Sequence, residues 1–292
     1  MKRIVFALPG NEALAQYIGR EPGARQGKLI VRAFPDGESY VRIADAVSGK
    51  EVILVCTLDR PDAKLLPLLF TARTMKEMGA KKITLVSPYL AYMRQDKRFK
   101  PGEAVTSLYF AGLLSSFSDE LITIDPHLHR RRSLSEIYSI PCRVIHATSL
   151  IADYIRDHMP HALVVGPDSE SEQWVSQVAR GSGSPYIVLQ KKRLGDTRVR
   201  ISAPQVKKYR DHTPVLVDDI ISTAHTMIET VSRLKKTGMP APVCIGVHGI
   251  FSGTAYEELK AAGASDIVTC NSIPHASNKI DLNRLIAKAL SK

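Results

Sequence analysis

The sequence predicts an α/β protein of two similar domains, each with a mostly parallel β-sheet flanked by helices. Short aliphatic runs alternate along the chain with longer segments in which apolar residues recur at helical spacing. Strands that alternate with helices are typical of parallel sheets covered by helices. A similar succession of basic helix end, glycine, turn and strand occurs in both halves, at 75–89 and 234–249.

Each predicted strand is a short aliphatic run bounded by turn residues. The predicted strands are 2–8, 51–56, 81–89, 120–126, 162–168, 186–192, 214–219 and 242–249. Two clear helices are expected at 63–79 and 226–238, because each ends in glycine, a frequent helix stop. We place the domain boundary near residues 142–148, which gives domains 1–145 and 146–292. A single sheet built from the whole chain is the structural alternative.

Composition limits the class of protein to which the chain can belong. Hydrophobic residues make up 44% and charged residues 24% of the sequence, as in a soluble globular protein. No apolar run approaches the roughly 20 residues of a membrane span, so no membrane partner is expected. MKRIVFALPG at the N-terminus is interpreted as a first strand rather than a signal peptide, which indicates a cytoplasmic protein. The four cysteines form no CxxC pair, which argues against structural zinc and a disulfide framework.

The chain is basic, with 40 Lys and Arg against 29 Asp and Glu, a net charge of +11. Such a charge suits either nucleic acid or phosphorylated small molecules. No helix-turn-helix, zinc-finger or RNP pattern occurs, and the basic residues concentrate in two short segments, 94–100 and 191–200. We therefore expect a phosphorylated small molecule as the ligand and no nucleic-acid partner.

One segment, VLVDDIISTAHTM at 215–227, predicts a binding site for a phosphorylated sugar. Asp218 and Asp219 end a predicted strand, and ligands of parallel α/β sheets bind at that end. The following turn opens a helix, whose backbone N–H groups can bind an anion. The segment thus offers acceptors for sugar hydroxyls and donors for a phosphate. The alternative is an acidic strand end followed by an ordinary Ser/Thr N-cap.

Together with four further segments in the same order, this stretch resembles the ribose-phosphate diphosphokinase (PRPP synthetase) family, which has a phosphoribosyltransferase-type fold. The four segments are FPDGESYVRI at 34–43, SPYLAYMRQDKRFKPGEAVTS at 87–107, ITIDPHLH at 122–129 and QKKRLGDTRVRIS at 190–202. KRFKPGE and KKRLGDTRVRIS are similar to the archaeal-like branch of the family. The resemblance spans nearly the whole chain.

The resemblance implies transfer of the diphosphoryl group of ATP to the 1-hydroxyl of ribose 5-phosphate, which yields 5-phosphoribosyl 1-diphosphate (PRPP) and AMP. It implies Mg²⁺ at His127 and Asp168, catalytic roles for Lys191 and Arg193, and a homodimer or a higher homo-oligomer such as a hexamer. The implied ATP-binding residues are Phe34, Asp36, Glu38, Arg94, Gln95 and Asp96. The implied ribose 5-phosphate-binding residues are Asp218, Asp219, Ser222, Thr223, Ala224, His225 and Thr226.

Physical chemistry gives each of these roles a rationale and an alternative. The aromatic ring of Phe34 and the two acids after it suit adenine, although PDG also predicts a simple hairpin turn. Arginine binds phosphate in a bidentate manner, but a basic loop can also be merely solvated. Mobile cations near 191–193 would stabilise a phosphoryl-transfer transition state, whereas an exposed basic hairpin is the alternative. Histidine is an unusual partner for Mg²⁺, which prefers oxygen, and alone it would indicate a structural residue.

Three features of the sequence depart from the family's usual pattern. SESE at 169–172 replaces small residues and glycines, His225 stands where glycine is frequent, and Ser222 stands where many bacterial members carry an acid. We expect His225 either to adopt the left-handed backbone conformation or to donate to the sugar phosphate. Two alternative functions stay open: a phosphoribosyltransferase that consumes PRPP, and a non-catalytic regulatory subunit.

Overall fold

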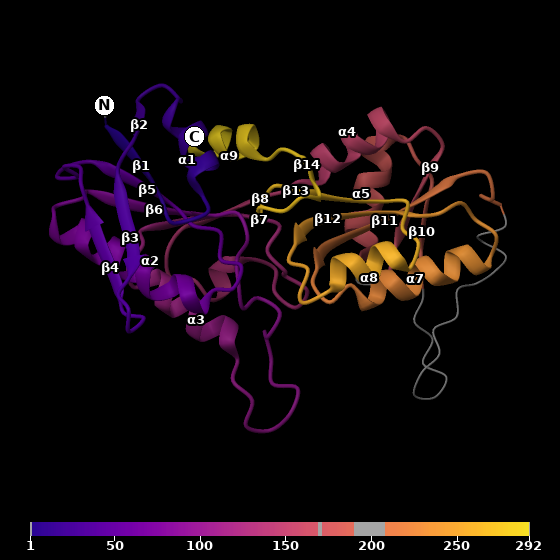
Figure 1. Cartoon of the computed structure of the whole chain (residues 1–292), viewed down its shortest axis with the longest axis horizontal. Helices are drawn as coiled ribbons and strands as arrows, with labels where there is room; N and C mark the ends of the chain where they lie inside the picture. The colour runs from indigo at the N-terminus through magenta and orange to yellow at the C-terminus, as the bar shows by residue number, and fades with distance from the viewer. Residues whose placement is uncertain (1, 169–170, 190–207, 292) are drawn as a thin grey trace. The chain divides into compact units, whose positions relative to one another are not determined.

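The computed structural model describes residues 2–168, 171–189 and 208–291 of the 292-residue chain. It forms two compact units, one of Met1–Ile145 with Asn283–Lys292 and one of His146–Leu282 (Figure 1). The sequence interpretation assigned residues 283–292 to the second domain, whereas the structure groups them with the first unit. Among the described residues, no helix is both long and apolar enough to cross a membrane.

The first unit contains a six-stranded sheet in the order β2-β1-β5-β6-β7-β8, in which every pair is parallel. Its strands are β1 (Arg3–Ala7), β2 (Ala24–Gln26), β5 (Glu51–Val55), β6 (Lys82–Ser87), β7 (Glu120–Ile124) and β8 (Cys142–Ile145). Val52 to Val55 are all buried, since helices cover both faces of a parallel sheet. This is why its central strands are continuous aliphatic runs rather than alternating ones.

The helices of this unit are α1 (Glu12–Gly19), α2 (Asp62–Glu77), α3 (Thr106–Ser115), the short η1 (Leu134–Glu136) and α9 (Asn283–Leu290). The α2 helix stops near the predicted position because Gly79 adopts a left-handed φ of 86°. Helix α9 packs against α1 and β8. Arg3 donates to the carbonyl of Leu290 at 2.8 Å, and Arg143 donates to the carbonyl of Ala289. These arginines satisfy carbonyls at the end of α9, which explains its place in the first unit.

An antiparallel pair, β3 (Leu29–Ala33) and β4 (Ser39–Ile43), forms a separate two-stranded hairpin in this unit. Its turn is the FPDGE segment, with Gly37 at a φ of 91°. The sequence interpretation expected a turn here but did not predict the flanking strands. Strand β3 contains an aliphatic run, Leu29–Val31, which was the available signal, whereas β4 mixes aliphatic and polar residues, and no residue of either strand is fully buried.

The second unit repeats the strand order of the first, as β10-β9-β11-β12-β13-β14, again with parallel pairs. Its strands are β9 (Ala162–Gly166), β10 (Tyr186–Val188), β11 (Thr213–Ile221), β12 (Val243–Gly249), β13 (Asp266–Cys270) and β14 (Asn278–Ile280). The equal topology confirms the predicted class of two similar α/β domains. Strand β11 ends at Ile221, two residues beyond the predicted end at 219.

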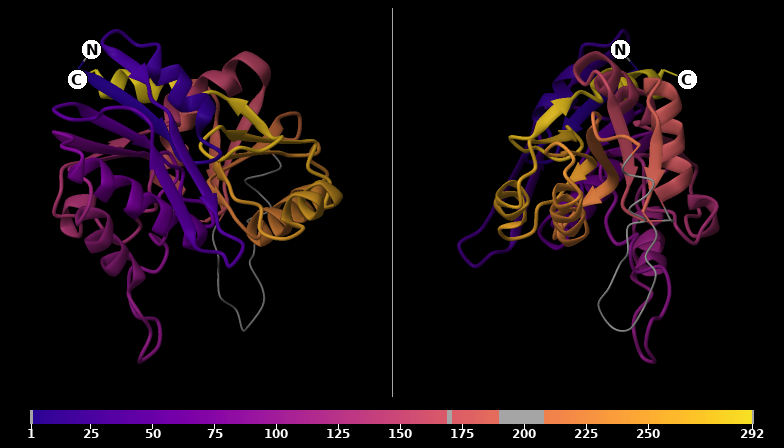
Figure 2. Two further views of the ribbon diagram at one scale, coloured as in Figure 1. Left: turned by 60° about the vertical axis from the view of Figure 1, so that its left-hand side comes forward. Right: turned by 90° about the vertical axis from the view of Figure 1, so that its right-hand side faces the viewer.

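In the described part of this unit, the helices that flank the second sheet are α4 (Thr148–His158), α5 (Glu172–Ser182), α7 (His225–Lys236) and α8 (Ala255–Ala261). Helices α4 and α5 pack together, and α7 and α8 lie side by side along the sheet (Figure 2). The connection through α5 leads from β9 to one side of the sheet, whereas those through α7 and α8 lead from β11 to the other. Right-handed crossovers therefore put α5 on the face opposite α7 and α8.

Candidate active site

The carboxyl edge of the second sheet offers a ligand site where the strand order reverses. The chain runs from β9 outwards to β10, and later from β11 outwards through β12 and β13. The connections that follow the neighbouring strands β9 and β11 therefore lead to opposite sides of the sheet, and such a switch point at the carboxyl ends of the strands is the usual ligand position in these sheets. Asp168 follows β9, and Asp218 and Asp219 lie near the end of β11. The fold thus brings these three predicted site residues to one edge.

The carboxyl groups at this edge repel one another. Asp218 is half-buried, and the backbone N–H of Asp219 donates to its Oδ1 at 3.0 Å. Burial, and then the negative charges of Asp219 and Asp168, raise the pKa of Asp218 well above the usual value of 3.8. Hydrogen-bond donors or a cation would relieve this repulsion. The edge is therefore suited to sugar hydroxyls or a divalent metal ion.

A short turn and a helix start follow β11, as the sequence predicted. Helix α7 begins at His225, and no side chain caps its N-terminus among the described residues. The first N–H groups of a helix have no intrahelical acceptors, and the helix dipole favours an anion there. Ser222 and Thr226 are half-buried beside this turn, and Thr223 is exposed. These features fit a phosphate group.

The structure corrects the backbone expectation for His225. The left-handed residue is Ala224, with φ 57° and ψ 2°, whereas His225 is the first helical residue. Because β11 extends to Ile221, only three residues remain to turn the chain into α7, and the last of them takes the left-handed conformation. His225 is exposed, so its side chain is accessible to a ligand.

The start of α5 shows how Asp168 is held. Ser171 donates from its hydroxyl to the Asp168 carbonyl at 2.6 Å and from its N–H to Asp168 Oδ1 at 3.2 Å. A β-carbon on Gly166 would lie 2.6 Å from Ser171 Oγ, so this close turn requires glycine at 166. Ser169 and Glu170 of the SESE segment lie outside the described residues, as do the predicted catalytic residues Lys191 and Arg193.

In the first unit, the predicted adenine-binding residues lie in the turn of the β3-β4 hairpin. Phe34 is 39% exposed, and the guanidinium of Arg32 lies 4.8 Å from its ring centroid. Asp36 Oδ1 accepts the N–H of Glu38 at 3.1 Å, so this carboxylate helps to form the turn. The side chains of all four residues are exposed and accessible to a ligand.

The predicted ATP-binding residues 94–96 differ in their exposure and in their contacts with other residues of the protein. Gln95 accepts from the Thr106 hydroxyl at 3.2 Å. The carboxylate of Asp96 is 3% exposed and forms an ion pair with Arg130 at 2.9 Å. Arg94 is exposed. Arg130 was missed by the sequence interpretation, although the run RRR at 130–132, directly after the ITIDPHLH motif, was the available signal.

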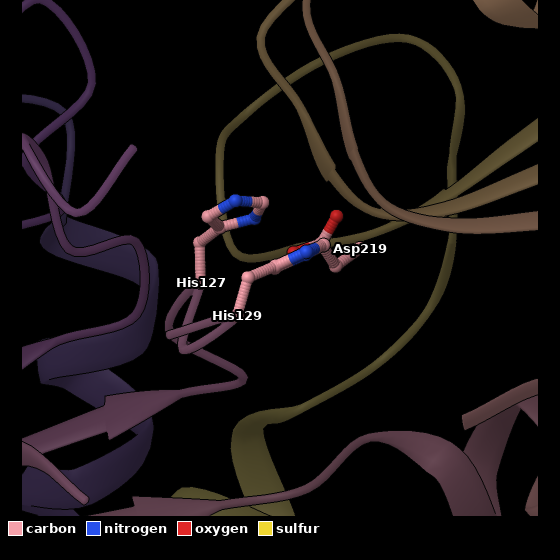
Figure 3. A group of neighbouring side chains, drawn as sticks. All are labelled: His127, His129 and Asp219. Atoms are coloured by element: carbon pink, nitrogen blue, oxygen red, sulfur yellow. The ribbon is translucent and has the colours of Figure 1, made fainter. Parts of the chain in front are cut away.

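His127 lies in the loop after β7, and its ring stacks on that of His129 with centroids 3.7 Å apart (Figure 3). Asp125, which directly follows the same strand, is buried and has a left-handed φ of 32°. This conformation turns the chain sharply after β7. His129 had no role in the sequence interpretation, whereas the structure places its ring against that of His127. Figure 3 also labels Asp219 of β11 in the second unit.

Known proteins match the chain over nearly its whole length. A family model described as the N-terminal domain of ribose phosphate pyrophosphokinase matches residues 3–117, and one described as a phosphoribosyl transferase domain matches residues 133–284. A ribose-phosphate pyrophosphokinase of Methanopyrus kandleri is 30% identical over 289 residues, 98% of this chain and 98% of that protein. One of Saccharolobus solfataricus is 31% identical over 272 residues, 90% of this chain and 91% of that protein.

The fold is likewise similar to a solved structure. A crystal structure of phosphoribosylpyrophosphate synthetase from Mycobacterium smegmatis has a TM-score of 0.85 to this chain at 24% identity. The match covers 100% of this chain and 98% of that one. Because the sequence identity is only 24%, this similarity supports the fold assignment alone.

Proposed function

We infer that this chain makes PRPP, because it belongs to the ribose-phosphate pyrophosphokinase family. It is an enzyme that transfers the diphosphoryl group of ATP to the 1-hydroxyl of ribose 5-phosphate. The hydroxyl oxygen forms a bond to the β-phosphorus, and the bond from that phosphorus to the α–β bridging oxygen breaks. AMP leaves with the bridging oxygen, and the hydroxyl proton passes to solvent. The observation that carries the assignment is the 30% identity to a named relative over 98% of the chain.

The ribose 5-phosphate site is proposed at the carboxyl edge of the second sheet. Asp218 and Asp219 accept hydrogen bonds from the ribose hydroxyls, which relieves the repulsion between their carboxylates. The backbone and hydroxyl groups of residues 222–226 bind the 5-phosphate at the start of α7. The switch-point position of these residues and the uncapped helix start support this assignment.

The ATP site is proposed to use Phe34, Asp36 and Glu38 of the hairpin turn with Arg94, Gln95 and Asp96. Phe34 offers an exposed ring for adenine, and Arg94 an exposed guanidinium for phosphate. Asp96 acts chiefly by holding Arg130, given their 2.9 Å ion pair. In the family this hairpin reaches the ATP of a neighbouring subunit, and we therefore propose a homodimer or a higher homo-oligomer. We also propose that the protein lies in the cytoplasm.

Catalysis in the family generally uses a metal ion, and we propose Mg²⁺ with His127 and Asp168 as its residues. The carboxylate-rich edge at Asp168 and Asp218 offers the oxygen donors that Mg²⁺ prefers, and the raised pKa of Asp218 indicates an unmet need for positive charge there. When bound, the ion neutralises phosphate charge. We propose that Lys191 and Arg193 stabilise the negative charge of the transferring diphosphoryl group.

The decisive measurement is AMP release from ATP and magnesium, with and without ribose 5-phosphate. The double variant Asp218→Asn/Asp219→Asn serves as the site test. AMP that forms only with the sugar phosphate, and not in the variant, supports both the reaction and the site. A well-folded wild-type protein that releases no AMP would overturn the proposed reaction. A phosphoribosyltransferase or a regulatory subunit would then be the better assignment.

A further inference from the structure

A segment after β12 braces the proposed 5-phosphate turn from behind. This bracing segment consists of Ile250, Phe251 and Ser252. The N–H groups of Ile250 and Phe251 both donate to the carbonyl of Ile221, at 3.0 and 3.1 Å. The N–H of Ser252 donates to the carbonyl of Ser222 at 3.0 Å. The hydroxyl oxygens of Ser252 and Ser222 lie 3.3 Å apart.

These hydrogen bonds decide which way the peptide groups of the turn face. In a trans peptide the C=O and the following N–H point in opposite directions. Since the carbonyls of Ile221 and Ser222 point at the bracing segment, the N–H groups of Ser222 and Thr223 point away from it. The carbonyl oxygens, which would repel a phosphate, are thereby turned aside and satisfied. The arrangement leaves amide donors for an anion on the other side of the turn.

One residue of the bracing segment has an unfavourable backbone conformation, which allows the segment to donate these hydrogen bonds to the turn. Phe251 has a left-handed φ of 46°, a conformation that is unfavourable for a residue with a side chain. Such strain persists only where the surroundings enforce it, and it concentrates at functional sites. The two bonds to the Ile221 carbonyl depend on this backbone geometry, because Ile250 and Phe251 converge on one oxygen.

Packing of the Phe251 ring enforces the strain. The ring is 6% exposed, and its centroid lies 5.2 Å from that of Tyr256 and 4.5 Å from that of His275. It also covers Gly249, where a β-carbon would lie 2.6 Å from Phe251 Cε2. His275 is itself fixed, because the N–H of Ser277 donates to its Nδ1 at 3.1 Å. These contacts fix the position of the Phe251 ring, and the fixed ring holds the backbone of Phe251 in its left-handed conformation.

We propose that Phe251 and Ser252 are positioning residues for the 5-phosphate of ribose 5-phosphate, and that Gly249 is required for the Phe251 ring to dock. The assignment rests on the proposed function of the same site. Phe251 orients the turn through backbone bonds to Ile221. Ser252 orients the Ser222 hydroxyl and the peptide after it.

The test compares Ser252→Ala and Gly249→Ala with wild type in steady-state AMP release and in calorimetric binding of ribose 5-phosphate. Ser252→Ala should raise the KM for ribose 5-phosphate about twofold to threefold, the effect of losing one weak exposed hydrogen bond. Gly249→Ala should raise it at least about tenfold, because the new methyl group displaces the ring and misplaces the turn. The KM for ATP should stay within about twofold in both, since ATP is bound by other residues.

A matched control is Ser265→Ala. Ser265 is also exposed, and its hydroxyl bonds the carbonyls of Ala241 and Pro242 at the amino end of β13, the opposite edge of the same sheet. It should leave both KM values unchanged. A wild-type protein that binds ribose 5-phosphate, with both test variants at wild-type affinity or with both substrates affected equally, would overturn the positioning role alone. A wild-type protein that binds no ribose 5-phosphate would overturn the proposed function and this role together.

Discussion

Two carboxylates on central strands, Glu120 in the first sheet and Asp218 in the second, have opposite surroundings. Glu120 begins β7, and its carboxylate meets Lys82 at 2.6 Å, Arg143 at 3.2 Å and the Thr84 hydroxyl at 3.2 Å. Burial by itself raises the pKa of Glu120, but the hydrogen bonds and charges of these partners outweigh it and hold the pKa below the usual 4.5. Its charge is thus satisfied within the fold.

Asp218, near the end of β11, is influenced by burial and by two further acids, and its pKa lies above the usual value. The charged form is therefore unfavourable in the protein alone. The difference teaches that the carboxylate at the amino end of its strand is paired within the fold, whereas the carboxylate near the carboxyl end of its strand is destabilised in its charged form, as suits the ligand role that we propose for it. Proteins tolerate such strain where it serves binding.

The largest expected effect comes from Asp218→Asn. AMP release should fall at least about 10²-fold, since a neutral amide accepts sugar hydroxyls less well and misplaces the ribose. The melting temperature should not fall, because the repulsion with Asp219 and Asp168 is removed. Activity and thermal unfolding are measured side by side. Asp211→Asn, an exposed acid ahead of β11, is the control and should change neither quantity. An active Asp218→Asn would contradict the ligand role.

The next largest effect is expected from His127→Ala, because His127 lies in the loop after the carboxyl end of β7 and is a proposed partner of Mg²⁺. The magnesium concentration for half-maximal activity should rise at least about tenfold, because a proposed partner of the ion is lost. His129→Ala is the informative companion, since the His129 ring stacks on His127 with centroids 3.7 Å apart and is not a proposed partner of the ion, so a smaller rise is expected. If the magnesium concentration for half-maximal activity rose equally in both variants, or in neither, the proposed difference between the roles of His127 and His129 would be contradicted.

Glu120→Gln should affect stability rather than activity. The side chain of Glu120 is 13% exposed, and loss of its charge leaves Lys82 and Arg143 less well paired. We expect a loss of about 1–2 kcal/mol in the free energy of unfolding. Urea denaturation measures it, with kcat for AMP release expected within about twofold of wild type. A large loss of activity without a loss of stability would break the contrast between the two edges.

The smallest effect, a dependence on pH, sharpens the contrast further. The folded-state pKa of Glu120 is depressed, so its stabilisation is complete above the usual 4.5 and is lost as pH falls below it. The pKa of Asp218 is raised, so its penalty grows as pH rises above the usual 3.8. Urea midpoints at pH 7 and pH 4 test this. At pH 7 the urea midpoint of Glu120→Gln should lie below that of wild type, and the midpoint of Asp218→Asn should lie above it. At pH 4 both midpoints should approach the wild-type value.

The core of the fold was predictable from the sequence because buried parallel strands are continuous aliphatic runs. A strand is present within each of the eight predicted ranges, with β11 longer than expected; residues 190–192 of the range 186–192 lie outside the described residues. Strands β2, β3, β4, β8, β13 and β14 were not predicted. Several of these are short, lie at sheet edges or are partly exposed, so packing rather than composition makes them strands.

Within the candidate site, the sequence alone determined the residue types and their order along the chain. The acids at 218 and 219, the Ser/Thr-rich turn and the helix after it follow from local propensity, which acts over a few residues. Their roles for ATP, ribose 5-phosphate and Mg²⁺ remain predictions.

Tertiary structure alone decided the rest. The pairing of Asp96 with Arg130 and the bracing of Ile221 by Phe251 join residues up to 34 positions apart in the chain. The choice of Ala224 rather than His225 as the left-handed residue was likewise visible only in the structure. Sheet topology brings Asp168 to the edge that holds Asp218, and the charge of Asp168 helps to raise the pKa of Asp218. Local sequence fixes which groups are present. Packing fixes which of them meet, because that depends on long-range strand order rather than on neighbouring residues.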